Sequence, residues 1–494
     1  SLSLPPYNYW LINFITFSLL FIFLFKNQNK NSNYFFIYGY IFGFGYFVSN
    51  LYWIPLSLLY DNNFKFFIPF AIILIPAFLS LFYAVAFLIF KLLLDTKSII
   101  LNILLFSLTL GLFEFIRGTI LSGFPWNLFA YSFSENINFI QITSLIGVYA
   151  FNTILITIFS IPSILFLNKK KYDIIGFFLI AILTVSIYLY GSFKVKVINN
   201  LKATTLPVEI KILSTKIPIE RFYLNVDVEE TLIKLVELSS PKKNDNTLFI
   251  WPEGIIPNTN LEELKNEFYY LIKKSFSKNH TILFGINDQK IENGKIKVYN
   301  SLSVIDNKAD VIFNYHKNKL VPFGEFLPLE NILSKVGLKT LTNNYQSYSA
   351  SSERKLFNLN KSGTIKILPL ICYEIIYSGK LSLNNNYNFI VNISEDGWFG
   401  NSIGPSQHFA HSIFRSVEYG KYTLRSANNG ISAIVDPSGK IINMLNTNNE
   451  GVISIKKMVK TNKTLFSTYG NKIYFLVILL YIFLIFSFKK LRNE

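Results

Sequence analysis

Seven long apolar segments constrain the fold of this chain more than any other feature. A helix needs about 20 apolar residues to cross the hydrocarbon core of a bilayer. A soluble protein would have nowhere to bury so many runs, since 51% of the residues are hydrophobic and 17% are aromatic. The segments are Trp10–Phe25, Tyr34–Trp53, Phe66–Phe90, Ile99–Ile116, Phe139–Leu167, Ile174–Tyr190 and Ile473–Phe488. They predict a multi-span helical membrane domain, although the short first and last segments could lie at the interface.

Basic residues in the connections predict the orientation of these helices, because cytoplasmic loops carry the excess of lysine and arginine. Alternate connections are almost free of basic charge. We therefore expect residues 1–191 to form about six spans, residues 192–472 to lie outside the cytoplasm, and residues 473–494 to form a last span with a basic cytoplasmic tail. The basic connections contain Lys26 and Lys30, Lys91 and Lys97, Lys169, Lys170 and Lys171, and Lys489, Lys490 and Arg492.

The region between the last two apolar segments alternates strand and helix patterns. This alternation predicts an α/β domain in which helices cover a sheet. Strands are expected at Val208–Leu213, Thr247–Trp251, Thr281–Ile286, Asn300–Ile305, Asp310–Tyr315, Ile365–Cys372, Asn388–Ile393 and Ser432–Val435, and helices at Val226–Leu238, Leu261–Phe276 and His408–Tyr422.

Charge and cysteine content argue against several function classes. The formal net charge is +17, but the lysines form no basic stripe interleaved with aromatic residues, so nucleic acid is not an expected partner. One cysteine cannot form an internal disulfide, and with four scattered histidines it offers no zinc-ligand spacing. We therefore expect no metal and no cofactor. The lone thiol is either a core residue or a nucleophile.

Three motifs at the ends of expected strands carry residues suited to nucleophilic catalysis. Ligand sites in α/β sheets gather at the carboxyl ends of strands, so one pocket could hold a carboxylate, an ammonium and a thiol. The motifs are Trp251-Pro252-Glu253-Gly254, Tyr315-His316-Lys317 with the following Leu320 to Glu325, and Leu370-Ile371-Cys372-Tyr373-Glu374.

The chemistry of these residues favours a cysteine nucleophile. A free thiol has a pKa of about 8.5, so only a small fraction is thiolate at neutral pH. Glu253 could accept the proton of Cys372 as general base. Lys317 could hold the thiolate and then the oxyanion that forms on the attacked carbonyl group.

Three more residues could support this chemistry. The backbone N–H of Tyr373 could supply a second oxyanion donor, and Glu325 and Glu374 could hold Lys317 in place and charged. Spacing alone leaves other interpretations open. A cysteine that ends an apolar strand is commonly a core residue, Trp-Pro-Glu could be a turn, and a lysine is commonly solvated.

Together the motifs resemble those of the nitrilase superfamily, whose catalytic triad of Glu, Lys and Cys lies on an αββα sandwich. Segments along almost the whole chain resemble the apolipoprotein N-acyltransferases, the membrane-embedded branch of that superfamily. These segments are Phe113–Gly118, Gly123–Trp126, Trp251–Glu253, Leu320–Glu325, Ile371–Ile375, Asp396–Gly400, Gly404–Phe409, Arg415–Glu418 and Asn428–Ile431.

The resemblance implies a two-step acyl transfer in the bacterial inner membrane, with the catalytic domain on the periplasmic side. The nucleophile would take an acyl chain from a phospholipid, such as phosphatidylethanolamine, as a thioester. The α-amino group of the diacylglyceryl-cysteine of a diacylated prolipoprotein would then accept it. The implied catalytic residues are Glu253, Lys317 and Cys372, with Glu325, Tyr373 and Glu374 in support and Trp398 in the wall of the acyl-chain pocket.

The sequence departs from the pattern of these proteins at three places. They usually have eight spans and this chain has seven, so we expect their first span to be missing from the sequence. Glu395 stands where they often have Asn. The first strand of the soluble domain ends in Ser214-Thr215-Lys216, without the expected glutamine and glycine.

Two other functions fit the same features. A membrane-tethered nitrilase-type amidase would use the same triad with water as acceptor. A transporter with a degenerate nitrilase-like domain could use Glu114 and Arg117, an i,i+3 pair near the end of a span, although these could equally form a structural pair or line a lipid entrance. Loss of Cys372 would abolish either enzyme but not a transporter.

We predict that a cysteine introduced at Asn244, in a Cys372→Ser background, reacts with a membrane-impermeant thiol reagent in whole spheroplasts. The reason is the lysine asymmetry of the loops, which puts residues 192–472 outside the cytoplasm. Labelling is measured before and after the membrane is broken. Protection of the cysteine until lysis would contradict the orientation.

Overall fold

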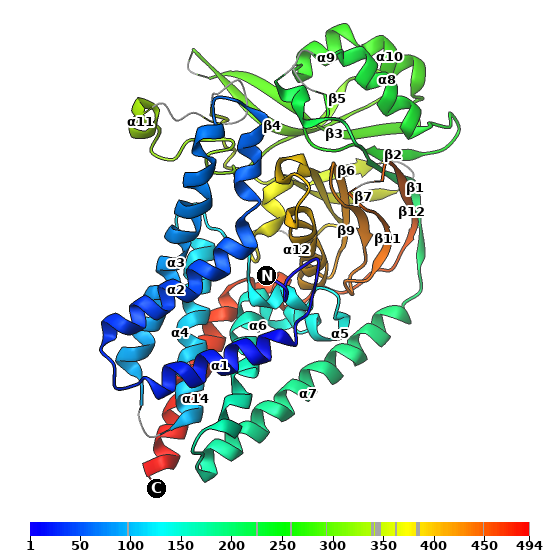
Figure 1. Cartoon of the computed structure of the whole chain (residues 1–494). Helices are drawn as coiled ribbons and strands as arrows, with labels where there is room; N and C mark the ends of the chain where they lie inside the picture. Colours follow the sequence, from blue (N-terminus) through cyan, green and yellow to red (C-terminus); the bar gives the residue numbers. More distant parts are fainter. Residues whose placement is uncertain are drawn as a thin grey trace.

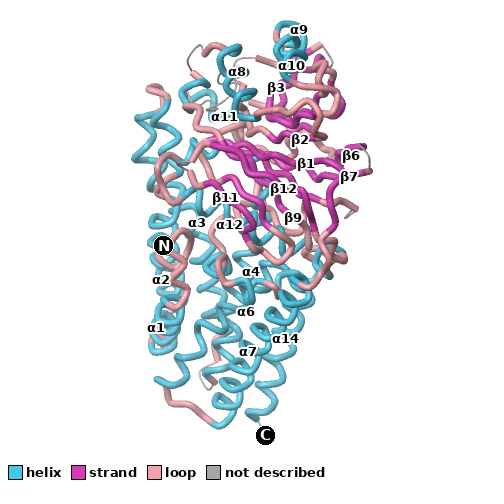
Figure 2. Tube along the Cα trace, turned by 90° about the vertical axis from the view of Figure 1, so that its right-hand side faces the viewer, coloured by secondary structure: helices cyan, strands magenta, loops and turns pink. Residues whose placement is uncertain are grey.

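The computed structural model describes residues 1–95, 98–223, 226–256, 259–292, 294–336, 340, 347–360, 363–381, 386–447 and 449–493. Lys97, one of the basic loop residues, lies outside these ranges. The chain forms a bundle of long helices and, next to it, a part with two β-sheets (Figure 1). Figure 2 shows the strands gathered at one end of the molecule and the C-terminus at the other.

All seven predicted apolar segments are helical. Five helical segments in the described ranges are long and apolar enough to cross a membrane, and α2 with the short helix η1 (Ile54–Tyr60) makes a sixth, bent by 44°. The first apolar helix is shorter, as expected, whereas the last is long enough to span. The helices are α1 (Ile12–Lys26), α2 (Ser32–Leu51), α3 (Ile68–Leu93), α4 (Ile99–Thr119), α6 (Thr143–Ser160), α7 (Lys171–Asn199) and α14 (Lys472–Asn493). The multi-span helical prediction is confirmed.

The domain limits stay a prediction. The expected limit at residue 191 falls inside α7, which continues to Asn199 before the first strand begins at Thr204. The limit at residue 472 coincides with the first residue of α14.

Glu114 and Arg117 form a closed, fully buried ion pair on α4. The hydroxyl of Tyr83 on α3 donates to Glu114, and Arg117 also donates to the backbone carbonyl of Phe124. A charged pair inside a helical bundle needs such partners because water is absent there. The contacts therefore join α3, α4 and the loop after α4, as expected for a structural pair.

The soluble part contains two six-stranded sheets. The order of the first is β12-β1-β2-β3-β4-β5 and that of the second is β11-β10-β9-β8-β7-β6. Strands β1, β2 and β3 are parallel to one another, as are β7, β8 and β9. A parallel bridge between Thr215 and Asn428 puts the ends of both trios at the same side. The strands are β1 (Thr204–Ser214), β2 (Thr247–Ile250), β3 (His280–Glu292), β4 (Lys295–Ile305), β5 (Val311–His316), β6 (Phe357–Asn360), β7 (Thr364–Ile371), β8 (Phe389–Glu395), β9 (Tyr422–Asn428), β10 (Ser432–Val435), β11 (Ile441–Leu445) and β12 (Gly451–Met458).

The eight expected strands are all present, but β6, β9, β11 and β12 were not predicted. Strand β9 is wholly buried although its sequence is largely polar, so no apolar run marked it. The expected helix Leu261–Phe276 is divided at Phe268 into α9 (Leu261–Glu267) and α10 (Tyr269–Ser275). The expected helix His408–Tyr422 begins at Gly404 and ends at Tyr419, as α12, because Gly420 adopts a left-handed conformation that stops it.

The two sheets and their helices form the expected αββα sandwich. Apolar residues such as Ile210 and Leu248 from the first sheet pack against Ile367 and Val391 from the second, which makes the central core. Helices α8 (Val228–Ser239), α9 and α10 cover the outer face of the first sheet (Figure 1). Helix α12 covers the outer face of the second sheet.

Helix α12, the helical layer on the second sheet, also packs against the membrane helices. Leu370 of the second sheet and Phe414 of α12 belong to the same buried apolar core as Val148 of α6. Helix α6 is interrupted at Gly147, whose φ of 76° and ψ of 169° break the helix, and the Glu418 carboxylate accepts from Val148 N at 2.8 Å. A side chain of α12 thus caps a half-helix of the bundle, which ties the two parts together.

We predict that Gly147→Ala lowers the melting temperature of the detergent-solubilised protein. Its Cβ would lie 2.1 Å from the Phe466 ring, and a positive φ alone costs a residue with a side chain about 1–3 kcal/mol. Gly45→Ala on α2 is the matched control, because its Cβ would meet nothing within 4 Å and alanine favours a helix by about 1 kcal/mol. Equal melting temperatures for the two variants would contradict the assigned role of the break.

Candidate active site

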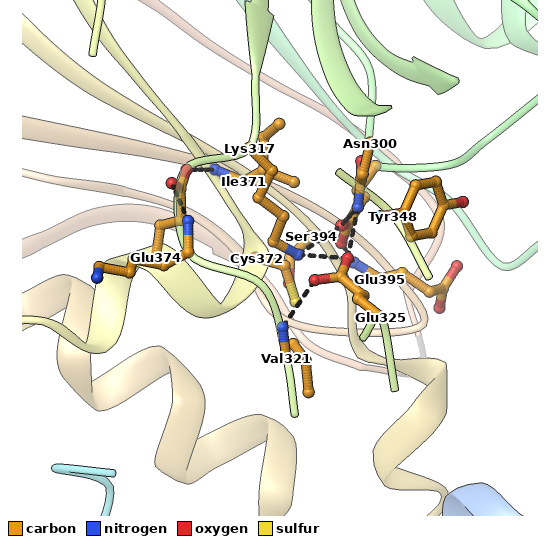
Figure 3. A network of polar contacts seen from close by, with 12 residues as sticks. Asn300, Lys317, Val321, Glu325, Tyr348, Ile371, Cys372, Glu374, Ser394 and Glu395 are labelled. Carbon is orange, nitrogen blue, oxygen red and sulfur yellow. Dashed lines mark hydrogen bonds and ion pairs between the residues drawn. The ribbon is translucent and has the colours of Figure 1, made fainter. Parts of the chain in front are cut away.

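Loops that follow strands of both sheets meet at one end of the sandwich. Glu253 follows β2 and Lys317 follows β5 in the first sheet, while Cys372 follows β7 in the second. Figure 3 shows the Lys317 side chain directed toward the Cys372 thiol, with Glu325 beside its ammonium. The fold therefore brings together the three residues that the sequence singled out.

The Lys317 ammonium lies buried between two carboxylates. Its Nζ is 2.8 Å from Oε1 of Glu325 and 3.3 Å from Oε1 of Glu253, and the side chain is 1% exposed. Burial by itself would lower the pKa of Lys317, but the charges of Glu253 and Glu325 outweigh it and hold that pKa well above its usual value. Lys317 is therefore a fixed positive charge at neutral pH.

The Glu253 carboxylate is held by three donors. Its Oε1 accepts from Lys317 and, at 2.8 Å, from Nδ2 of Asn300, and its Oε2 accepts from the backbone N–H of Glu395 at 2.9 Å. Asn300 also donates to Glu325 at 2.7 Å. A carboxylate has about four lone-pair sites, so one remains for the proton of an incoming nucleophile.

Cys372 occupies a strained turn. Strand β7 ends at Ile371, one residue earlier than expected, and Cys372 has a φ of 45°, in the left-handed region that side chains disfavour. The short helix η8 (Cys372–Ile376) starts there. This turn takes the side chain out of the alternation of the strand, and such strain is typical of functional positions.

The pKa of the Cys372 thiol is raised well above its usual value. Burial is the largest cause, the charge of Glu253 adds to it, and the charge of Lys317 opposes it. The resting side chain is therefore a thiol. Its reaction needs a base that removes the proton during attack.

The two supporting carboxylates lie in different places. Glu325 contacts Lys317 directly, as described above, whereas Glu374 binds backbone groups of both flanking loops. Its Oε1 accepts from Asn318 N at 2.9 Å and Lys319 N at 3.2 Å, and its Oε2 accepts from Ile371 N at 2.9 Å. Glu374 thus fixes the chain just after Lys317 rather than the ammonium that we expected it to hold.

Tyr373 links the turn of Cys372 to the membrane bundle. Its hydroxyl donates to the carbonyl of Gly123 at 3.0 Å, and the hydroxyl of Tyr377 donates to that of Ser122 at 2.8 Å. The loop after α4, which contains the Gly123–Trp126 motif, therefore lies directly against η8. The oxyanion role of the Tyr373 N–H stays a prediction.

Trp398 belongs to a group of aromatic residues, which we call the aromatic wall. Its ring stacks on Phe222 at a centroid distance of 5.3 Å and meets Tyr60 and Tyr223 edge-on at 6.2 and 6.4 Å. Tyr60 comes from η1 of the bundle, and its hydroxyl donates to the carbonyl of Gly397 at 3.0 Å. The wall is therefore built from both parts of the molecule, and contact of Trp398 with an acyl chain stays a prediction.

Comparisons with known proteins agree with this arrangement. The apolipoprotein N-acyltransferase N-terminal domain family matches residues 1–161, and the carbon-nitrogen hydrolase family matches residues 216–457. A Rhodopseudomonas palustris protein named apolipoprotein N-acyltransferase is 31% identical over 95% of this chain and 90% of its own length. The chain belongs to the apolipoprotein N-acyltransferase family.

Another apolipoprotein N-acyltransferase, from Rickettsia typhi, is 34% identical over 86% of this chain and 84% of its own. Among solved structures, a CN-hydrolase superfamily protein of Xanthomonas campestris matches 51% of this chain and 90% of its own, at 13% identity and a TM-score of 0.36. Membership in the N-acyltransferase family makes this chain a membrane enzyme with a carbon-nitrogen hydrolase domain.

Sequence reasoning missed a polar network below the nucleophile of this N-acyltransferase. The carbonyl oxygen of Cys372 accepts from Nε2 of His408 and from Nδ2 of Asn392, each at 3.3 Å. Burial, followed by the charge of Arg425, lowers the pKa of His408, whose Nδ1 lies 3.0 Å from both Oδ1 of Asp396 and Nη2 of Arg425. Arg425 also binds Asp396 at 2.7 Å. The network holds the strained turn.

The sequence also gave no signal for Asn300, which contacts both Glu253 and Glu325. It opened an expected strand, where an isolated polar residue carries no signal of its own. The only hint to His408 was its place inside the motif Gly404–Phe409.

Within the described ranges, no group of three or more His, Cys, Asp or Glu residues could hold a metal ion.

We predict that Glu253→Gln lowers the pKa of Cys372 and that Lys317→Met raises it. Loss of a neighbouring negative charge favours the thiolate, and loss of a positive charge disfavours it. The measurement is the pH dependence of alkylation by iodoacetamide, followed by intact mass, which is specific because the chain has one cysteine. Shifts of both midpoints in the same direction would contradict the assigned electrostatics.

Proposed function

We propose that this enzyme transfers a fatty acyl chain from a phospholipid, through a thioester on Cys372, to the N-terminal amine of the diacylglyceryl-cysteine of apolipoproteins. The observation that carries the proposal is the buried Lys317 ammonium, paired with Glu253 and Glu325 and directed toward the thiol. Such a fixed positive charge stabilises a thiolate and an oxyanion in a site with little water. The names of the relatives support a lipoprotein as acceptor.

In the first step, Glu253 takes the thiol proton while Cys372 Sγ attacks the carbonyl carbon of an acyl ester. Lys317 and the backbone N–H of Tyr373 stabilise the oxyanion. The ester C–O bond then breaks, and the departing lysophospholipid oxygen takes the proton from Glu253. The acyl chain remains on Sγ as a thioester.

In the second step, the amine of the acceptor attacks the thioester carbon, and Glu253 removes the proton that the nitrogen must lose. The C–S bond breaks, an amide forms, and Cys372 recovers its proton from Glu253. Burial of the site supports transfer to an amine rather than to water, because Cys372 is 8% exposed and Glu253 is 6% exposed.

We also propose that the site faces the periplasmic side of the inner membrane, where both substrates are anchored in lipid. The turn that begins η8 contacts the loop after α4, and residues 118–138 of that loop carry no Lys or Arg, as is typical of loops outside the cytoplasm. The aromatic wall, built partly on η1, is our candidate for the surface along which the acyl chain lies. In this proposal Trp398 binds the chain by apolar contact.

We predict that purified protein mixed with phosphatidylethanolamine gains the mass of one acyl group on Cys372 and releases lysophospholipid. Cys372→Ser should show no adduct at an unchanged melting temperature, because a serine alkoxide is much harder to form beside a carboxylate base. Glu253→Gln should slow adduct formation by about 10²–10⁴-fold. Substantial acyl transfer by Cys372→Ser would overturn the nucleophile assignment.

The same experiment shows which step needs Glu253 and whether the acyl group passes to an amine or to water. Normal adduct formation in Glu253→Gln, with a defect only after a diacylated lipopeptide is added, would show that Glu253 serves the second step alone. Release of free fatty acid in place of an N-acylated lipopeptide would favour the amidase alternative.

A further inference from the structure

Arg221 and Glu395 form a fully buried ion pair next to the candidate base, and the reaction above uses neither side chain. Each side chain is 1% exposed. Arg221 lies in the short helix η5 (Ile219–Phe222) after β1, and Glu395 is the last residue of β8, so the pair joins the two sheets. Burial of two opposite charges costs desolvation free energy, so a buried pair is weak evidence of added stability by itself.

The five N–H groups of the Arg221 guanidinium match five acceptor contacts. Nε and Nη2 both donate to the carbonyl of Gly254, at 3.1 and 3.0 Å, and Nη2 also donates to Glu395. Nη1 donates to the carbonyls of Pro218 and Ile217 at 3.0 and 3.4 Å. Gly254 directly follows Glu253, so Arg221 holds the main chain on one side of the base.

Glu395 holds the base from the other side. Its backbone N–H donates to Oε2 of Glu253 at 2.9 Å. Its side chain accepts from Gly397 N at 2.7 Å, from Nδ2 of Asn428 at 2.7 Å and from Arg221. These three donors hold the Glu395 side chain next to the backbone N–H that binds Glu253.

We propose that the Arg221–Glu395 pair is a positioning device for the general base. Arg221 fixes the carbonyl that follows Glu253, while Glu395 orients the amide that holds the carboxylate, so that the free lone pair faces the thiol. This inference rests on the proposed function, in which Glu253 takes the proton of Cys372. It gives Glu395 a role at the position where the sequence departs from the expected Asn.

The pair also reaches the aromatic wall. The guanidinium carbon of Arg221 lies 4.4 Å from the ring centroid of Phe222, which stacks on Trp398. Phe222 therefore packs against the guanidinium that holds the Gly254 carbonyl.

The charges of the pair make the proposal testable by a double-mutant cycle. Arg221→Met leaves a buried carboxylate without its counter-charge, and Glu395→Asn leaves a buried guanidinium without its own, so each should disturb the base. The double variant removes both charges and keeps the amide N–H of residue 395. Each single change should slow thioester formation by about 10–100-fold. The double variant should be about as slow as either single variant, because both changes break one device and their losses should not add.

The experiment measures single-turnover acyl adduct formation on Cys372 with saturating phosphatidylethanolamine in detergent micelles. The maximal rate should fall while the half-saturating phospholipid concentration stays unchanged. Arg221→Lys is a further variant, which keeps the charge but cannot make both contacts to Gly254, and should remain slow. Lys234→Met is the matched control, because it removes an exposed ion pair with Glu450, at 2.9 Å, and should leave the rate unchanged.

The outcomes separate this inference from the proposed function. No adduct in the wild-type protein would overturn the proposed function, whatever the pair does. A wild-type adduct with unchanged rates in Arg221→Met and Arg221→Lys would overturn the inference alone. Additive losses in the double variant, matched by additive falls in melting temperature, would reduce the pair to a purely structural contact and would also overturn it.

Discussion

The apolar surface that the second sheet and α12 share with the membrane helices is the constraint on which the rest of this structure depends. Phe409 and Val417 of α12 are buried in one continuous core with residues of α4 and α6. Burial of apolar area contributes about 25 cal/mol per Å², so a shared core of this kind makes the sandwich and the bundle one unit. It also places the turn of Cys372 against the loop that follows α4, where Tyr373 reaches Gly123.

Within this framework, the site brings together charged side chains that could not be buried without a partner of opposite charge. Lys317 is tolerated inside the protein because Glu253 and Glu325 both face it. The same carboxylate of Glu253 raises the pKa of Cys372, and the ammonium of Lys317 opposes that effect. The thiol and the ammonium are therefore linked through Glu253, because its charge raises the pKa of both Cys372 and Lys317.

Other buried ionic contacts serve the backbone rather than the reacting groups. Burial alone would raise the pKa of Asp396, but Arg425 and His408 outweigh it, so that pKa is lowered and the carboxylate stays charged. Through His408 this group supports the carbonyl of Cys372, in a conformation that costs strain. Pairing with an opposite charge offsets the desolvation cost of such groups inside the protein. Their directional hydrogen bonds fix loops that apolar contacts could not orient.

The sequence by itself determined the seven helices, most of the strands and the three motif residues Glu253, Lys317 and Cys372, because helix length, strand pattern and strand-end chemistry are local properties of a chain. Only the tertiary structure decided the rest. Strand β9 is buried although it is polar, since its side chains find partners on other elements, as Arg425 does with Asn392 of β8 and with Asp396, which follows that strand. Glu374 turned out to hold main-chain N–H groups, and the contact between Arg221 and Glu395 joins residues 174 positions apart. Such contacts depend on how distant segments pair across two sheets, and no local pattern records that pairing.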